Sequence, residues 1–481
     1  MNRRLSRRLL TFLALALLLT ALVLILRPID TRYQDLLRQG DVLAARTERT
    51  AAAGVYEEAS RLRPDAPGPY LHLAQLYLDW GRTDEALTAL EKAERLGVGQ
   101  GDSVRLAQLW IEVYVARADW PVVIERTQQL LALVSDDTSA AVDASTTTDV
   151  RHTLARAHVE LRQWDTARAE YETLLQSDPN DTLAHERLGA LLVGSDAAAI
   201  QHLYAAETDL SIELLAVLER PDALDNPAYV QALLGRVLFE AREWALASNH
   251  FEQALQFDPA YPDAHAYLGY SLDQMGYPRE AWPHLLMAVS WAPDSAVTHI
   301  FLGMHYDSQG DSVAARVEYE AAYDLDPTNP ATCISIGKTW ADEGRYVAAE
   351  IWFLAAVSLQ PEDPTLWEIL VRFYLDHTIT FAGQAVAVAD KLLELAPDDA
   401  QAYDLRGWAA FQVGDYVTAQ DFLLQALDLD PALASAHYHF GMLLSVQGDS
   451  QGAREAFVRA IDLDTAGTFV PLVERAMSGI P

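Results

Sequence analysis

A fixed period of 34 residues runs through the second half of the chain. Glycines recur at this interval at Gly235, Gly269, Gly303 and Gly337. After one interruption the same interval separates Gly407 and Gly441. A proline closes each unit, at Pro259, Pro293, Pro327, Pro361, Pro397 and Pro431. Between them, each unit holds two stretches of about a dozen residues with apolar side chains at helical spacing. This period predicts a stack of helix pairs rather than several unrelated domains.

Small and aromatic residues recur at fixed positions within each unit. The unit that starts at Ala296 carries Gly303, Ala315, Tyr319, Ala322 and Pro327. The unit that starts at Pro330 carries Gly337, Ala349, Phe353, Ala356 and Pro361 at the same positions. The pattern resembles the tetratricopeptide repeat (TPR) family, which places small residues at positions 8, 20 and 27, an aromatic near 24 and proline at 32. The resemblance implies an all-α fold, a right-handed superhelical solenoid of helix-turn-helix repeats.

The resemblance divides the chain into segments of different regularity. Seven regular units fill residues 228–467, and a tail of residues 468–481 follows. A divergent TPR-like sub-array occupies residues 33–193 and contains a polar, loop-like stretch at 136–149. Residues 194–227 keep apolar helical stretches without the repeat signature, so we expect an irregular helical joint there.

The weakest of the seven units runs from Pro364 to Asp399. Val371 replaces its glycine, and the stretch HTIT, residues 377–380, supplies two residues beyond the period. We therefore expect a distorted turn at this point.

The N-terminus has the pattern of a membrane anchor. A basic segment, residues 1–8, precedes an uncharged run at residues 9–26. As a helix these 18 residues would span about 27 Å, close to a hydrocarbon core of roughly 30 Å. The arginines on the near side predict a cytoplasmic N-terminus and a repeat body outside the cytoplasm. The alternative is a signal peptide whose cleavage gives a secreted protein, but no small-x-small site follows the run.

Charge and cysteine usage exclude several classes of function. The formal charge of −34 opposes binding to nucleic acid or to an anionic membrane surface, because both require clustered Lys and Arg. A basic or neutral partner fits better. Cys333 is the only cysteine, which excludes an intrachain disulfide and a thiolate zinc cluster.

Two histidines in SAHYHFG, residues 435–441, are candidate metal ligands by their spacing. His437 occupies position 4 of its unit, as do His185, His265 and His299 in theirs. In the family this position on the first helix usually holds a large aromatic that packs against neighbouring helices. His439 lies two residues further along the same helix, about 200° around its axis, so the two rings cannot share one ion. The pattern predicts packing and no metal site.

Other short motifs are also explained better by the repeat than by a catalytic or ligand-binding site. IGKT at residues 336–339 ends like a phosphate-binding loop, but Thr332 stands where that motif requires glycine. GVGQG at residues 97–101 follows an expected helix rather than a strand. No G-x-S-x-G and no H-E-x-x-H occurs. We expect no enzyme activity, no catalytic residue and no cofactor.

Function is then expected on the surface formed by the first helices. In the family, ligands usually meet positions 2, 5, 9, 12 and 13 of the first helix. The candidates for partner binding are Tyr229, Arg236, Tyr270, Met304, Lys338, Arg372, Trp408, Tyr438 and Met442. The same positions add Phe239, Asp273, Asp307, Glu368, Asp404 and Phe411 to the expected lining. Lys338 and Arg372 are expected to be isolated cations, without the asparagine partners of a carboxylate clamp.

These observations favour a non-enzymatic scaffold, anchored in the membrane, that binds a protein or peptide in the groove of its superhelix. Aromatic contacts to an extended or helical peptide fit the lining best. The alternative function is a noncatalytic regulatory subunit of an envelope polysaccharide or cell-wall enzyme. The sequence does not identify the partner.

Overall fold

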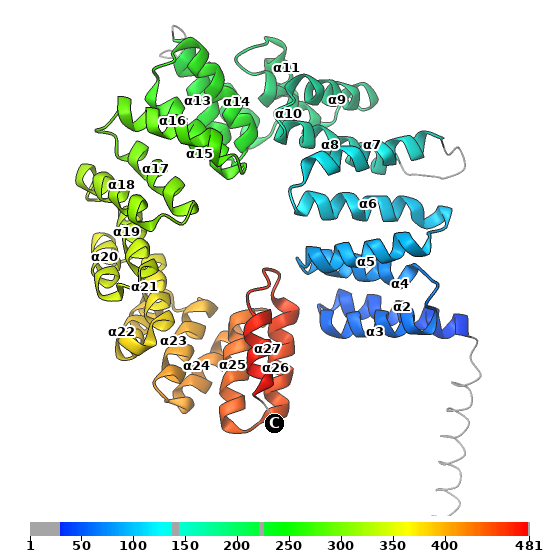
Figure 1. Ribbon diagram of the computed structural model, residues 1–481, viewed down its shortest axis with the longest axis vertical. Coiled ribbons are helices and arrows are strands. Elements are labelled where there is room, and N and C mark those ends of the chain that lie inside the picture. Colours follow the sequence, from blue (N-terminus) through cyan, green and yellow to red (C-terminus); the bar gives the residue numbers. More distant parts are fainter. Residues whose placement is uncertain (1–28, 137–143, 221–225, 480–481) are drawn as a thin grey trace, which may run out of the picture. The chain divides into compact units, whose positions relative to one another are not determined.

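The computed structural model describes residues 29–136, 144–220 and 226–479. These residues contain 26 helices and no strand, so the predicted all-helical class is confirmed (Figure 1). No helix in these ranges is long and apolar enough to cross a membrane. The predicted anchor at 9–26 and the basic segment at 1–8 lie outside the described residues.

The helices belong to two compact units. The first unit joins both ends of the chain, up to Arg117 and again from Ala432, and the second spans Ala118–Pro431. Helices of the first unit are α2 (Ile29–Ala45), α3 (Arg49–Leu62), α4 (Gly68–Asp79), α5 (Thr83–Leu96), α6 (Gln100–Ala116), α25 (Ala434–Gln447), α26 (Ser450–Leu463) and α27 (Val470–Ser478).

The second unit contains α7 to α24. Its first part is α7 (Trp120–Asp136), α8 (Ala144–Glu160), α9 (Trp164–Ser177), α10 (Thr182–Leu192), α11 (Ala198–Ala206) and α12 (Asp209–Leu218). Six pairs follow: α13 (Pro227–Glu240) with α14 (Trp244–Phe257), α15 (Pro262–Gln274) with α16 (Pro278–Trp291), α17 (Ala296–Ser308) with α18 (Ser312–Leu325), α19 (Pro330–Asp342) with α20 (Tyr346–Leu359), α21 (Pro364–Asp376) with α22 (Thr378–Leu395), and α23 (Ala400–Gln412) with α24 (Tyr416–Leu429).

The pair α17 and α18 shows why the sequence folds into such units. A Cβ on Gly303 would lie 2.6 Å from the ring of Tyr319, so glycine allows the two helices to approach closely. Gly310 ends the first helix at φ +77°, a left-handed conformation that glycine adopts without strain. Asp311 then caps α18, since its carboxylate accepts a hydrogen bond from the Ala314 N–H at 3.0 Å.

The histidines at position 4 hold consecutive units together. In each of His185, His265 and His299, Nε2 lies 3.1 Å from the carbonyl oxygen of the proline six residues earlier. A carbonyl only accepts, so Nε2 carries the proton. Trp367 makes the same contact through its indole N–H, at 2.8 Å from the Pro361 carbonyl. The ring at this position therefore fastens the first helix to the end of the preceding unit.

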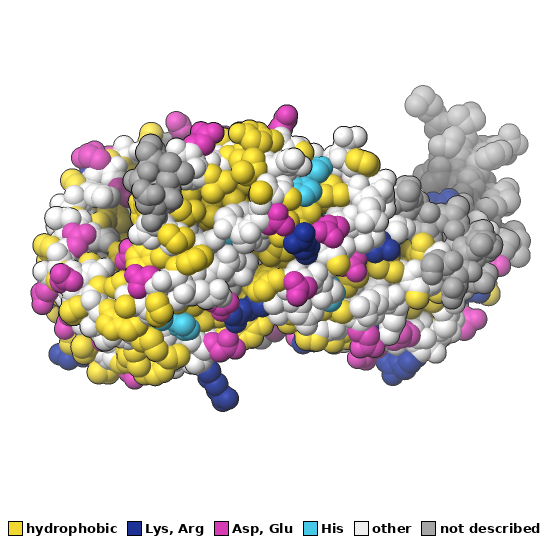
Figure 2. All heavy atoms as spheres, turned by 90° about the horizontal axis from the view of Figure 1, so that it is seen from above, with side chains coloured by type: hydrophobic (Ala, Val, Ile, Leu, Met, Phe, Trp, Pro, Cys, Tyr) yellow, Lys and Arg dark blue, Asp and Glu magenta, His cyan; other side chains and the backbone are white. Residues whose placement is uncertain are grey.

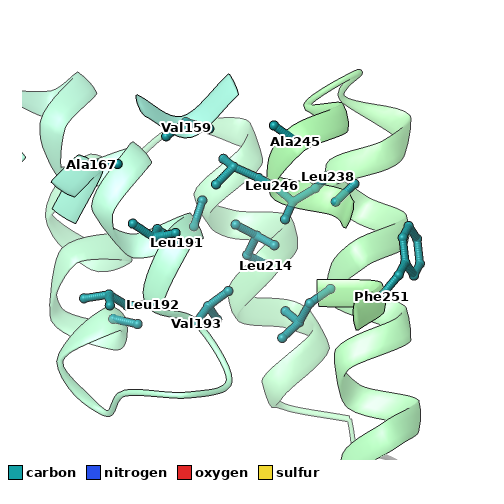
Figure 3. Packing of buried hydrophobic residues seen from close by; sticks show 14 of the residues in the cluster. Val159, Ala167, Leu191, Leu192, Val193, Leu214, Leu238, Ala245, Leu246 and Phe251 are labelled. Carbon is teal, nitrogen blue, oxygen red and sulfur yellow. The ribbon is translucent and has the colours of Figure 1, made fainter. Parts of the chain in front are cut away.

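The expected joint at 194–227 contains the short helices α11 and α12 and lies inside the second unit. A single hydrophobic core continues through it, from Val159 and Ala167 through Leu214 to Leu246 and Phe251 (Figure 3). Polar contacts add to this core.

Two of these polar contacts connect helices far apart in sequence. Nε2 of the buried His250 in α14 lies 3.0 Å from the carbonyl oxygen of Ala190 in α10. Arg162, at the turn between α8 and α9, forms ion pairs with Glu252 and Glu280. The regular pairs are thus attached directly to the divergent ones.

Three local features differ from the expected segments. The polar stretch expected as a loop to Asp149 ends earlier, because α8 begins at Ala144. The extra residues of the Pro364 unit lengthen its second helix: α21 and α22 are separated by His377 alone, and α22 has 18 residues where α20 has 14. The C-terminal tail forms α27, whose Val473 is fully buried against α26.

Within the first unit, the last repeat docks on the first. Arg49 of α3 donates to the carbonyl oxygen of Asp462 in α26 at 2.6 Å. The indole N–H of Trp80 donates to the carbonyl of Ile461 at 2.9 Å. Gly81, at φ +76°, comes so close to Thr465 that a Cβ would lie 2.1 Å from its carbonyl oxygen. The repeat period gives no sign of this docking, because it describes only neighbouring units.

Candidate functional site

The predicted partner-binding residues lie on first helices, but they differ in exposure. Exposed side chains belong to Arg236 (α13), Met304 (α17), Lys338 (α19) and Arg372 (α21). Partly buried ones belong to Tyr229 (α13), Tyr270 (α15) and Trp408 (α23), and in the first unit to Tyr438 and Met442 (α25).

A cavity of about 400 Å³ lies on the first-helix face of α17, α19 and α21. It brings together two of the predicted candidates, Lys338 and Arg372. Its other lining residues are Asp307, Ala341, Asp342, Phe353, Ile369, Phe373, Asp376 and His377. The cavity thus combines an apolar floor with charged side chains, which is the usual composition of a site for a polar ligand with an apolar part.

Carboxylates outnumber cations at this cavity. Asp307, Asp342 and Asp376 line it, against Lys338 and Arg372. Partial removal from solvent raises the pKa of Asp307, and the charge of Asp342 adds to this effect while Lys338 opposes it. Partial removal from solvent also raises the pKa of Asp376. A raised carboxyl pKa means that the charged form lacks compensation, and a cationic ligand would supply it.

The two cations differ in their surroundings. Arg372 donates from Nε to Glu368 at 2.8 Å, one helical turn earlier, so the expectation of an isolated cation is wrong for this residue. Lys338 has no ion pair among the described residues.

An aromatic cluster covers the neighbouring first helices. The ring of Tyr270 lies 5.2 Å from Phe239, 4.9 Å from Phe301 and 5.8 Å from Trp244, measured between centroids. Arg236 lies 5.7 Å above the ring of Tyr267 in the same cluster. Tyr270 therefore packs against other helices of its own array and also keeps part of its ring at the surface.

Three residues of the expected lining make contacts within the array. Asp404 is fully buried and accepts a hydrogen bond from the Gln401 side chain at 3.1 Å, so its place in the groove was predicted wrongly. The ring of Trp408 stacks on Phe411 with centroids 4.7 Å apart. Asp273 lies 2.8 Å from Nδ1 of the buried His305, which ties α15 to α17.

Sequence reasoning missed the acidic residues Asp342 and Asp376. Both occupy position 13 of their units and stand 34 residues apart, as Asp273 and Asp307 do at position 12. This recurrence was visible in the sequence. The contribution of Phe353 to the cavity was not, because it comes from a second helix that the position rule assigns to the core.

On the face seen in Figure 2, hydrophobic side chains form patches between acidic ones, and Lys and Arg are sparse. This agrees with 69 acidic against 35 basic residues in the chain.

Comparison with known proteins points to one family. Tetratricopeptide repeat models match residues 37–99, 148–191 and 400–433. Among solved structures, the chain is similar to yeast Tom70, at 15% identity and a TM-score of 0.40, with 94% of this chain and 96% of that one covered. It is also similar to a tetratricopeptide repeat protein from Parabacteroides merdae, at 14% identity and a TM-score of 0.42, covering 52% and 97%. No curated protein matches the chain.

Proposed function

Because the chain belongs to the tetratricopeptide repeat family, we propose that it is a non-enzymatic scaffold that binds a protein or peptide on its first-helix face. Stacked helix pairs present a continuous row of first helices, and such rows serve as extended binding surfaces. The candidate contacts are the exposed and half-buried residues of α13 to α21 described above.

The partner is a basic peptide segment with at least one large apolar side chain. The observation that carries this is the cavity of α17, α19 and α21, which Asp307, Asp342 and Asp376 line together with apolar side chains. A Lys or Arg side chain of the partner would compensate these carboxylates, and an apolar side chain would cover Ile369 and Phe373. The strong negative charge of the whole chain would also steer a basic partner toward it.

The scaffold is anchored in a membrane by residues 9–26, with its repeat body outside the cytoplasm. The length of the apolar run and the preceding arginines support this proposal. Detergent, but not high salt, should release the protein from membranes, because a hydrophobic segment rather than charge holds it. Release by salt alone, or a soluble mature chain that begins after residue 26, would favour the signal-peptide alternative.

Selection from a random peptide library tests the binding function. The full chain in detergent should retain peptides enriched in Lys or Arg next to an aromatic or aliphatic residue. The double variant Asp342→Asn and Asp376→Asn keeps the shape of both side chains and removes their charge. It should weaken binding of the selected peptides by roughly 10-fold or more, because charge-assisted hydrogen bonds are lost.

A matched control removes the same charge elsewhere. Asp324 and Asp428 are exposed on the second helices α18 and α24. Replacing both by Asn should leave affinity within about 2-fold, since these side chains lie outside the cavity. Equal losses in the two double variants would mean that overall charge, not this cavity, attracts the peptide. Selected peptides without basic residues would contradict the proposed partner class.

A further inference from the structure

A second cavity, of about 410 Å³, lies where the start of α14 meets α8 and α10 in the second unit. Residues 194–227 interrupt the repeat, and α14 reaches back to the divergent helices, as the contact of Arg187 with Glu243 shows. No single repeat could form this cavity. It is a consequence of the joint.

Arginine dominates the charge of this cavity. Arg156, Arg187 and Arg242 line it together with Glu160 and Glu243, which leaves one net positive charge in a strongly acidic protein. Arg187 is paired with Glu243 at 2.6 Å, and Arg156 lies 3.8 Å from Glu160. Arg242 has no ion pair among the described residues.

The backbone of Arg242 resembles that of Ala118 and Arg162 at the earlier turns, which also have positive φ. It adopts φ +60°, the left-handed conformation, at the turn between α13 and α14. Later units of the same compact unit place glycine at this turn, namely Gly276, Gly310, Gly344 and Gly414. An arginine is strained in this conformation, where glycine is not. Arg162 forms ion pairs with Glu252 and Glu280, whereas Arg242 has none among the described residues and lines the cavity, so it is available for contact with a ligand.

The remaining wall of the cavity is mostly apolar. Val159, Leu183 and Leu246 line it beside the ring of Tyr171. His152 also lines it, and the buried Nδ1 of this histidine has no hydrogen-bond partner among the described residues, while Nε2 lies 2.8 Å from Asp181. An inorganic anion could use the guanidinium groups but not the apolar wall.

We propose that this cavity binds an organic carboxylate that carries an apolar group. A carboxylate matches the planar fork of a guanidinium, and a single negative charge balances the net charge of the lining. The apolar group would lie against the leucine and valine side chains. A free carboxylic acid and the last residue of a polypeptide offer the same chemistry.

A purely structural role explains only part of this arrangement. The pair of Arg187 with Glu243 fastens α14 to α10 and needs no ligand. It does not involve Arg242, which lines the cavity and has no ion pair among the described residues. The proposal therefore rests on Arg242, with Arg156 as the second guanidinium.

Calorimetric titration of the full chain in detergent tests the proposal. The probes are 4-methylpentanoate, which represents a free acid, and N-acetyl-leucine, which represents a chain terminus. N-acetyl-leucine amide is the neutral counterpart, and detergent alone is the blank. At least one acid should bind in the millimolar range or tighter, and the amide should not. The tighter of the two acids identifies the source of the carboxylate.

The variant Arg242→Gly separates binding from stability. It restores the residue of the other turns, so the melting temperature should stay unchanged or rise. Affinity for the acid should fall about 10- to 100-fold, because a charge-assisted hydrogen bond is lost. Arg156→Gln should weaken binding in the same direction and serves if Arg242→Gly misfolds.

Arg279→Gln is the control, because Arg279 is exposed on α16 outside the cavity. It should keep the affinity of the unmodified chain. The proposal is overturned if acid and amide bind equally, if neither acid binds, or if a folded Arg242→Gly variant retains full affinity. The peptide site at α17, α19 and α21 is not involved, so failure here leaves the proposed scaffold function standing.

Discussion

Thr50 donates both its backbone N–H and its hydroxyl to one carboxylate oxygen of Asp462, at 2.8 and 2.6 Å. The two residues are 412 positions apart in sequence. Asp462 is buried, and burial is the main cause that raises the pKa of its carboxyl group, while the bonds from Thr50 oppose that rise. A buried carboxylate with two donors at the start of α3 acts as an N-terminal cap supplied by another repeat.

Replacing Asp462 by alanine should loosen α3. The change removes the acceptor of both Thr50 donors, and because Thr50 is exposed and its donors can bind water, it should cost about 1 kcal/mol. Hydrogen exchange should therefore speed up in α3. Asp449→Ala is the control, because Asp449 caps the same helix α26 at Gly452 and does not contact α3. Unchanged exchange in α3 after Asp462→Ala would show that the docking contributes no stability.

The close approach within a repeat predicts a ranking of glycine substitutions. A Cβ on Gly303 would lie 2.6 Å from Tyr319, whereas a Cβ on Gly337 would lie 3.2 Å from Phe353. Gly303→Ala should therefore cost about 1–3 kcal/mol through overpacking. In Gly337→Ala the milder contact is offset by a gain in helix propensity of about 1 kcal/mol, so stability should change little. Urea unfolding measures the stability of both variants. A larger loss for Gly337→Ala than for Gly303→Ala would contradict the described packing.

These positions show which structural features could be predicted from the sequence. The period placed the glycine of each unit and the histidines at position 4 correctly, because both depend on contacts inside one unit or with the next. It failed at Asp404, which has a groove position yet is buried. Position alone does not reveal which neighbours cover a side chain. Contacts between distant segments, such as Thr50 with Asp462 or Arg187 with Glu243, leave no periodic trace at all.

Acid should destabilise the second unit through His284. Burial first, then the neighbouring His265 and Arg162, lower the pKa of His284 to about 4. The ordinary pKa is 6.5, so between about pH 6.5 and pH 4 this histidine is protonated in the unfolded chain and neutral in the folded chain. Stability contributed by the neutral ring is complete above about pH 6.5 and is lost as the pH falls toward 4. Allowing for partial exposure, the loss should be about 2 kcal/mol.

The variant His284→Gln isolates this effect. A glutamine amide can still donate to Nδ1 of His265, which lies 2.8 Å from the ring nitrogen of His284 in the native protein. Melting temperatures at pH 7 and pH 4.5 should differ less for the variant than for the unmodified chain. Parallel losses in both proteins would assign the acid sensitivity to other groups, among them the buried His250, whose pKa is also lowered.

Tyr438 and Met304 were both predicted to bind a partner, but the structure gives them different surroundings. The ring of Tyr438 lies 5.9 Å from Phe457 and 5.4 Å from Phe469, whereas Met304 is 40% exposed on α17. Tyr438→Ala should therefore lower the free energy of unfolding by about 2 kcal/mol, because it leaves a gap beside two aromatic rings. Met304→Ala should change it by less than about 0.5 kcal/mol. Urea unfolding of the two variants is the measurement, and equal stability would mean that Tyr438 does not support α26 and α27. In that case its ring would be available to a partner, as the repeat position alone predicts.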